Sequence, residues 1–144
     1  MKTRHFINQL DRRAIETAIR AAEHKTSGEI RVVVHHQPVE DAVAFAQREF
    51  IRLGMQKTRQ RNAVLLFIAP VSQSFALIGD EGVHRKCGAA FWQEVAAAMQ
   101  KYFSAGDHSA AIREGIDRAG QLLAREFPRQ DGDANELPDR VIEQ

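Results

Sequence analysis

Apolar residues recur along this chain with two different spacings, and their order predicts an α/β fold. The run Ala63–Ala69 has no polar residue, which is typical of a central strand whose two faces are both covered. Residues 29–35 are rich in β-branched side chains and predict an earlier strand. After a break at Pro70, residues 74–79 predict a third strand. Because the connection is only about four residues long, the second and third strands should form an antiparallel hairpin.

Four other segments carry their apolar residues on one helical face. We expect helices over about residues 12–24, 40–53 and 83–103, the last broken at Gly88, and a final helix between Asp107 and Pro128. Asp11 is a suitable N-cap for the first helix, and Gly54 is a suitable C-cap for the second.

Helices before, between and after three strands predict a three-layer α/β/α sandwich with a small mixed sheet and about four main helices. The crossover through residues 40–53 should be right-handed, so strands 29–35 and 63–69 should be parallel. The length of 144 residues favours one domain, residues 1–128, followed by a polar C-terminal tail, residues 129–144.

Composition excludes several classes of partner. Lys and Arg total 20 against 19 Asp and Glu, which gives no electrostatic case for nucleic acid or an anionic membrane. The single cysteine, Cys87, excludes an internal disulfide and suits a reducing compartment. The longest apolar run, Ala63–Val71, falls far short of the roughly 20 residues of a membrane helix, and the N-terminus lacks a signal-peptide core. We therefore expect a soluble, cytoplasmic protein with no membrane span.

The expected topology brings polar residues from distant parts of the chain to one end of the sheet. That end holds the starts of the first two strands and the exit of the third. The residues expected there are Ser27, Glu29, Arg59, Arg61, Asn62, Asp80 and Glu81.

Asp80 and Glu81 stand between Gly79 and Gly82, and glycine lets a loop turn both carboxylates toward a common point. Hard cations such as Ca²⁺ and Mg²⁺ prefer oxygen ligands of this kind, and Glu29 could supply a third carboxylate. These three residues are the candidate metal ligands. The alternative is that Asp80 caps the following helix, where its charge also meets the positive end of the helix dipole.

Arg59 and Arg61, with Asn62 beside them, are candidate phosphate ligands, because guanidinium groups bind phosphate through two parallel hydrogen bonds. The alternative is a solvated basic loop that leads into a strand. His84 lies close to the acidic residues but is expected on the surface, and Cys87 is expected to be a small buried residue rather than a nucleophile.

Residues 131–135, DGDAN, match the first alternating ligands of an EF-hand loop. Glu136 occupies the position that requires glycine, and Ile142 occupies the position of the final glutamate. We therefore predict no EF-hand here.

Motifs spread over nearly the whole chain resemble the TPM-domain family, which is named after thylakoid-lumen, photosystem-repair and receptor-modulator proteins. The motifs are Ser27-Gly28-Glu29-Ile30, Met55 with Thr58, Arg61-Asn62-Ala63-Val64-Leu65-Leu66, Phe75-Ala76-Leu77-Ile78-Gly79-Asp80, Gly82-Val83, Gly88 with Phe91-Trp92, Gly115-Ile116 and Asn135-Glu136-Leu137-Pro138-Asp139. The resemblance implies an α/β/α sandwich, a divalent-cation site at an acidic end of the sheet, and a phosphatase activity attributed to some members. This chain departs from the family where Ala63 follows Asn62 in place of glycine, and it shows neither the signal peptide nor the membrane anchor of many members.

Two functions follow as expectations. The first is a domain that binds a divalent cation, Ca²⁺ or Mg²⁺, with weak phosphomonoester hydrolysis as a candidate activity on a small phosphorylated ligand. The second is a non-catalytic module that binds a protein partner or serves structure alone. The sequence offers no nucleophile elbow, P-loop or zinc spacing, so catalytic residues are not assigned.

Overall fold

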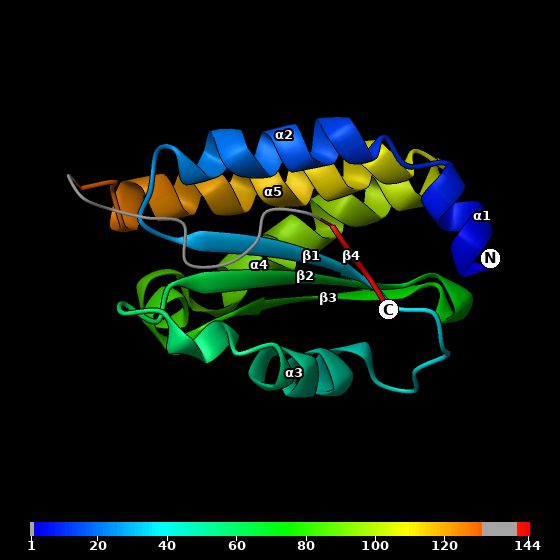
Figure 1. Ribbon diagram of the computed structural model, residues 1–144, viewed down its shortest axis with the longest axis horizontal. Coiled ribbons are helices and arrows are strands. Elements are labelled where there is room, and N and C mark those ends of the chain that lie inside the picture. The colour runs from blue at the N-terminus through cyan, green and yellow to red at the C-terminus, as the bar shows by residue number, and fades with distance from the viewer. Residues whose placement is uncertain (1, 131–140) are drawn as a thin grey trace.

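The computed structural model describes residues 2–130 and 141–144, which form three layers (Figure 1). The middle layer is a mixed sheet of four strands in the order β3-β2-β1-β4. Helix α3 covers one face of this sheet, while helices α2, α4 and α5 cover the other. The predicted α/β/α sandwich is confirmed.

The main helices begin and end close to the predicted boundaries. They are α2 (Arg12–Glu23), α3 (Ala42–Arg52), α4 (Glu81–Ser104) and α5 (His108–Glu126). Each of α2, α3 and α5 begins after an aspartate whose side chain accepts a hydrogen bond from the backbone N–H three residues later; these caps are Asp11, Asp41 and Asp107. Such caps satisfy N–H groups that have no partner inside the helix.

A short helix, α1 (Thr3–Asn8), was not predicted. Six residues are too few to display a helical stripe, and a helix this short is unstable by itself. Helix α1 is held instead by tertiary packing, since Phe6 and Ile7 are buried in the main core.

Strand β2 (Ala63–Ala69) lies inside the sheet, and all seven of its residues are buried. Strand β1 (Glu29–Val34) pairs with it in parallel, with Ile30 opposite Val64. Strand β3 (Ser74–Gly79) pairs with the other side of β2 in the antiparallel sense, with Leu77 opposite Leu66. The predicted hairpin and parallel crossover are both confirmed.

A fourth strand, β4 (Ile142–Glu143), pairs in parallel with β1 and was not predicted. Side chains of α3 fix the residue that follows it. Gln144 Nε2 donates to Glu49 Oε2 at 2.6 Å, and Arg52 Nη2 donates to Gln144 Oε1 at 2.6 Å. The last residues of the predicted polar tail therefore belong to the sheet. The DGDAN segment and the motif Asn135–Asp139 lie outside the described residues.

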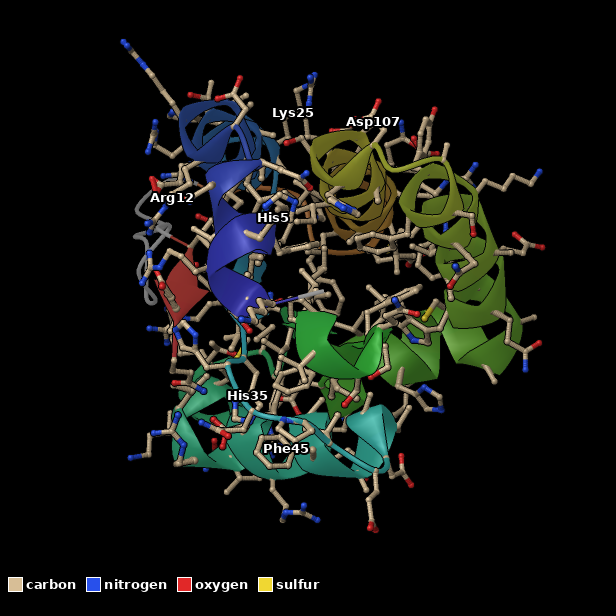
Figure 2. The ribbon with its side chains drawn as sticks, turned by 90° about the vertical axis from the view of Figure 1, so that its right-hand side faces the viewer. His5, Arg12, Lys25, His35, Phe45 and Asp107 are labelled. Carbon is tan, nitrogen blue, oxygen red and sulfur yellow. The ribbon has the colours of Figure 1, made fainter. Side chains whose placement is uncertain are left out.

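The sheet separates two hydrophobic clusters, which Figure 2 shows from one end of the sandwich. Ile30, Val32 and Val34 of β1 pack into the larger cluster with α2, α4 and α5, whereas Val33 packs toward α3. This alternation follows from the two-residue period of a strand. It fixes which side chains of each strand lie on either face of the sheet.

Helix α4 is interrupted at Gly88, whose φ of 73° and ψ of 175° are not helical. This confirms the predicted break, since glycine adopts positive φ without the steric penalty of a Cβ atom. Within the described ranges, no helix is both long enough and apolar enough to span a membrane.

Candidate functional site

The strand pairing brings the predicted acidic residues to one end of the sheet, on either side of Ala63. Glu29 lies opposite Ala63 in the parallel pair, and the Asp80 backbone N–H donates to the Ala63 carbonyl at 2.9 Å from the hairpin side. Glu29 and Asp80 therefore stand two strand spacings apart, roughly 10 Å between their backbones. The predicted convergence at this end holds for the backbone positions.

Asp80 is engaged by Arg61 through two hydrogen bonds. Arg61 Nε donates to Asp80 Oδ2 at 2.7 Å, and Arg61 Nη2 donates to Asp80 Oδ1 at 2.9 Å. Asp80 is 6% exposed, while the Arg61 side chain keeps 38% of its surface exposed. Hydrogen bonding to Asp80 raises the pKa of the Arg61 guanidinium. This ion pair links the residue that follows β3 to the loop that precedes β2.

Asp80 is also the N-cap of α4, because its Oδ1 accepts a hydrogen bond from the Glu81 backbone N–H at 2.8 Å. The capping alternative is thus realised in the structure. Glu81 is the first residue of the helix rather than part of a loop, which corrects the predicted start at residue 83. The reason is that Asp80 provides the cap, so the helix begins immediately after it.

The backbone around the ion pair is tightly packed at Gly82. A Cβ atom at this position would lie 2.5 Å from the Gln60 carbonyl oxygen and 2.6 Å from that of Arg61. The Gly82 N–H donates to the same Arg61 oxygen at 3.0 Å, and Arg61 itself has a positive φ of 52°. The close approach between α4 and this loop requires glycine, and it places the Arg61 side chain next to Asp80.

Glu81, the second predicted carboxylate, points to the surface. Its side chain is 58% exposed and lies 3.5 Å from Arg61 Nη1 and 3.7 Å from Arg85 Nη2. Exposed ion pairs of this kind contribute little stability. Glu81 is therefore the most accessible of the three candidate metal ligands.

Glu29 and Asn62 are both nearly inaccessible, at 2% and 1% exposed. Asn62 Nδ2 donates to Ser27 Oγ at 3.2 Å, and the Asn62 backbone N–H donates to Thr58 Oγ1 at 3.3 Å. The first bond joins the β1 entry to the β2 entry, and the second lies within the loop that leads into β2. Asn62 thus has a structural role in this arrangement, whereas Arg59 lies on the exposed surface of the same loop.

The donor chemistry of Asp80 and Glu81 suits a hard cation, but the present geometry does not form a preassembled site. Among the described residues, no group of three or more His, Cys, Asp or Glu side chains is placed to hold a metal ion. Both oxygens of Asp80 are already used by Arg61. A cation would have to take the place of the guanidinium.

Cys87 on α4 is half-buried, and burial raises the pKa of its thiol. A raised pKa keeps the sulfur protonated near neutral pH and therefore less nucleophilic. This agrees with the predicted packing role.

Sequence reasoning placed Arg61 and Asp80 at the same end of the sheet but did not pair them. The hairpin register carried part of the signal: Val64 lies opposite Gly79, so Asp80 lies beside Ala63, two residues from Arg61. The register does not fix where the Arg61 side chain points. The packing of Trp92 against Gly79, where a Cβ atom would lie 2.5 Å from the indole, had no comparable signal.

The chain is similar to proteins of one known family. A family model described as TPM domain matches residues 1–122. The NMR structure of BA42 protein from the psychrophilic bacterium Bizionia argentinensis is 34% identical, with a TM-score of 0.85 and 92% coverage of each chain. The N-terminal domain of a protein from P. gingivalis, also solved by NMR, shares the fold alone at 13% identity, with a TM-score of 0.59 and coverage of 77% of this chain and 72% of that one. No curated protein matches the sequence.

Proposed function

Because this chain belongs to the TPM-domain family, we propose that its acidic sheet end binds a divalent cation, Ca²⁺ or Mg²⁺, in competition with Arg61. The proposal rests on the two-point ion pair between Arg61 and Asp80. The pair holds a carboxylate at the sheet end with a cationic side chain that remains partly exposed and can move into solvent. In this view the guanidinium occupies the position that a metal ion would take.

Removal of the guanidinium would leave the carboxylates of Asp80 and Glu81 next to each other. Two adjacent negative charges repel, and a divalent ion relieves that repulsion. Glu29, on the far side of Ala63, is the remaining carboxylate of the proposed set. Water molecules would complete the ligands, since Mg²⁺ in particular retains several of them.

The ion pair also sets the affinity. A cation gains its contacts with Asp80 only after two charge-assisted hydrogen bonds to Arg61 are lost, and such bonds are stronger than neutral ones. The wild-type protein should therefore bind the cation weakly, and a variant without the guanidinium should bind it more tightly.

The test compares Arg61→Gln with Arg59→Gln, which removes the same charge from the same loop. Calorimetric titration with CaCl₂ and with MgCl₂ should give Arg61→Gln an affinity at least about tenfold above wild type, or about 1.4 kcal/mol. Arg59→Gln should change the affinity by about twofold or less, because exposed charges act weakly through solvent. Equal effects of the two variants would mean that general electrostatics, not displacement, controls binding.

Phosphomonoester hydrolysis is the second candidate activity. It is favoured by the position of Arg61, since a guanidinium released from a carboxylate keeps the geometry to bind a phosphate through two hydrogen bonds. Arg59 lies in the same loop and could contribute charge. Release of nitrophenol from para-nitrophenyl phosphate, with Mg²⁺ or with EDTA, measures this activity directly. An Arg61→Lys variant that loses the activity while it still binds the cation would support the proposed phosphate contact.

The non-catalytic interaction module remains the alternative. The outer surface of α3 favours it, because Val43 and Ile51 are 50% and 56% exposed. If neither wild type nor Arg61→Gln responds to millimolar cation, the metal proposal and the hydrolytic one are both wrong. The Arg61–Asp80 pair would then serve structure alone.

A further inference from the structure

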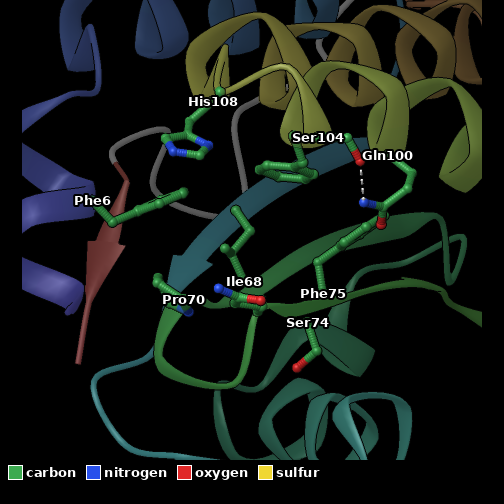
Figure 3. A pocket seen from close by; sticks show the side chains of 11 residues that line it. Phe6, Ile68, Pro70, Ser74, Phe75, Gln100, Ser104 and His108 are labelled. Carbon is green, nitrogen blue, oxygen red and sulfur yellow. Dashed lines mark hydrogen bonds between the residues drawn. The ribbon is translucent and has the colours of Figure 1, made fainter. Parts of the chain in front are cut away.

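A cavity of about 360 Å³ lies at the end of the sheet opposite the acidic residues (Figure 3). Its walls come from three regions that are distant in sequence: α1, the turn from the end of β2 to the start of β3, and the turn from the end of α4 to the start of α5. Small-molecule sites in proteins commonly have volumes of about 300–1,000 Å³. The cavity is therefore large enough for a compact ligand.

Four ring side chains form a connected wall around this cavity. Ring centroids are 4.7 Å apart for Phe6 and His108, 6.0 Å for Phe103 and His108, and 5.0 Å for Phe75 and Phe103. The pairs are tilted, at 39°, 39° and 44°, as is usual for aromatic contacts. A further flat ring placed among them would meet faces and edges of the same kind.

The remaining lining is neutral. It consists of Ile68 and Pro70, the amides of Gln73 and Gln100, and the small residues Ser74, Ser104 and Gly106. Gln100 Nε2 donates to Ser104 Oγ at 3.0 Å, so these two polar groups are partly satisfied by each other (Figure 3). Within the described part of the chain, no Asp, Glu, Lys or Arg side chain lines the cavity.

His108 does not add charge under ordinary conditions. Burial lowers the pKa of its imidazole, with His5 acting in the same direction and the adjacent Asp107 acting against it. The ring is therefore neutral near pH 7. A charged ligand would lose its hydration here without gaining an opposite charge, which is unfavourable.

We propose that this cavity binds an uncharged, ring-bearing small molecule, which packs between Phe6, Phe75 and Phe103 and meets the amide of Gln100 at the rim. The aromatic wall supplies the binding energy, because burial of apolar surface is favourable. The amides and hydroxyls orient the ligand, as a few polar groups do in apolar pockets. This site is separate from the acidic end of the sheet, and either proposal can fail without the other.

The test uses N-phenyl-1-naphthylamine, a neutral aromatic fluorophore, with the full-length protein at pH 7.5. We expect saturable binding of one probe per chain, with increased emission. Ser104→Phe places a ring at the mouth of the cavity from an exposed position at the end of α4, and should lower the affinity at least about tenfold. Gln93→Phe, an exposed site on the same helix outside the cavity, is the matched control and should stay within about twofold of wild type.

Two further measurements make the result decisive. Amide shifts in a ¹⁵N-labelled sample should concentrate at Gln73–Phe75 and Ser104–His108 on addition of the probe. The anionic analogue 1-anilinonaphthalene-8-sulfonate should bind at least about tenfold more weakly than the neutral probe, because its charge finds no partner. The inference is overturned by non-saturable binding, by equal losses in the two phenylalanine variants, by shifts centred on α3, or by equal or tighter binding of the anion.

Discussion

The two ends of the sheet differ in composition and in packing: one holds charged and polar side chains that bond to each other, and the other holds aromatic side chains around a cavity. At the acidic end, Arg61 and Asp80 bond to each other, and Ser27 bonds to Asn62. At the aromatic end, Phe6, Phe75, Phe103 and His108 surround a cavity. Buried charges need partners because an unpaired one is costly. Apolar rings need no such partner, and at this end they line a space that no side chain of the described residues fills.

This difference determines what each end can bind. A ligand at the acidic end would compete with a side chain of the protein itself, so its affinity would be a difference between two interactions. A ligand at the aromatic end would displace only solvent. We therefore expect the acidic end to be selective but weak, and the aromatic end to bind neutral rings without rearrangement.

Strand β2 runs between the two ends, so a destabilising substitution at its centre should lower the stability of both. Leu66 and Leu65 are fully buried and face opposite clusters. Truncation of either to alanine should lower the free energy of unfolding by about 2–5 kcal/mol, through lost burial and a residual cavity. Urea denaturation measures this. A loss below about 1 kcal/mol at both positions would be typical of surface sites and inconsistent with a central strand.

Two glycines, Gly82 at the acidic end and Gly106 at the aromatic end, allow the steric cost of an added methyl group to be compared with the cost of a positive φ. Gly82→Ala should cost about 2–3 kcal/mol, because the new methyl group meets two backbone oxygens that cannot easily move. Gly106→Ala meets no atom within 4 Å but must keep a φ of 80°, so the cost should be about 1–2 kcal/mol. Thermal unfolding of both variants gives the order. A larger loss at Gly106 would mean that the backbone oxygens around Gly82 can move aside for a methyl group.

Loss of the ion pair should have a smaller effect. Asp80→Asn keeps a good N-cap residue for α4 but removes the charge that holds Arg61. We expect a loss of about 1–2 kcal/mol, less than for a fully buried pair because Arg61 remains partly exposed. The loss should persist in EDTA. If EDTA abolishes it, the stability of wild type at this end comes from bound metal rather than from Arg61.

The smallest expected change in stability is its dependence on pH, and we expect it to arise from histidines at the aromatic end. Burial lowers the pKa of both His35 and His108 below the ordinary value of 6.5, and His35 donates its backbone N–H to Ile68 at that end of the sheet. The unfolded chain then binds more protons than the folded one between the lowered pKa values and pH 6.5, so stability falls as the pH drops through that window.

Denaturation at a series of pH values between 7.5 and 5 tests the sign. His108→Asn and His35→Asn should each reduce the slope, and His84→Asn, at an exposed position of the acidic end, is the matched control. An unchanged slope in both test variants would place the pH response elsewhere.

Much of the architecture follows from local patterns. The unbroken apolar run of β2, the short turn after it and the aspartate caps of α2 and α5 are visible without any knowledge of the fold. Helix α1 and strand β4 are not, because they have six and two residues. Segments this short show no periodicity in sequence, and they form only because they pack against or pair with the rest of the fold.

The candidate sites divide in the same way. The sequence by itself determined which polar residues gather at the acidic end, since strand direction and hairpin register are local consequences of turn length and crossover. Only the tertiary structure decided that Arg61 bonds to Asp80, because the direction of a long side chain depends on its neighbours. The aromatic cavity was likewise decided in three dimensions. Phe6, Phe75, Phe103 and His108 come from four separate elements, and space between packed elements exists only after they have packed.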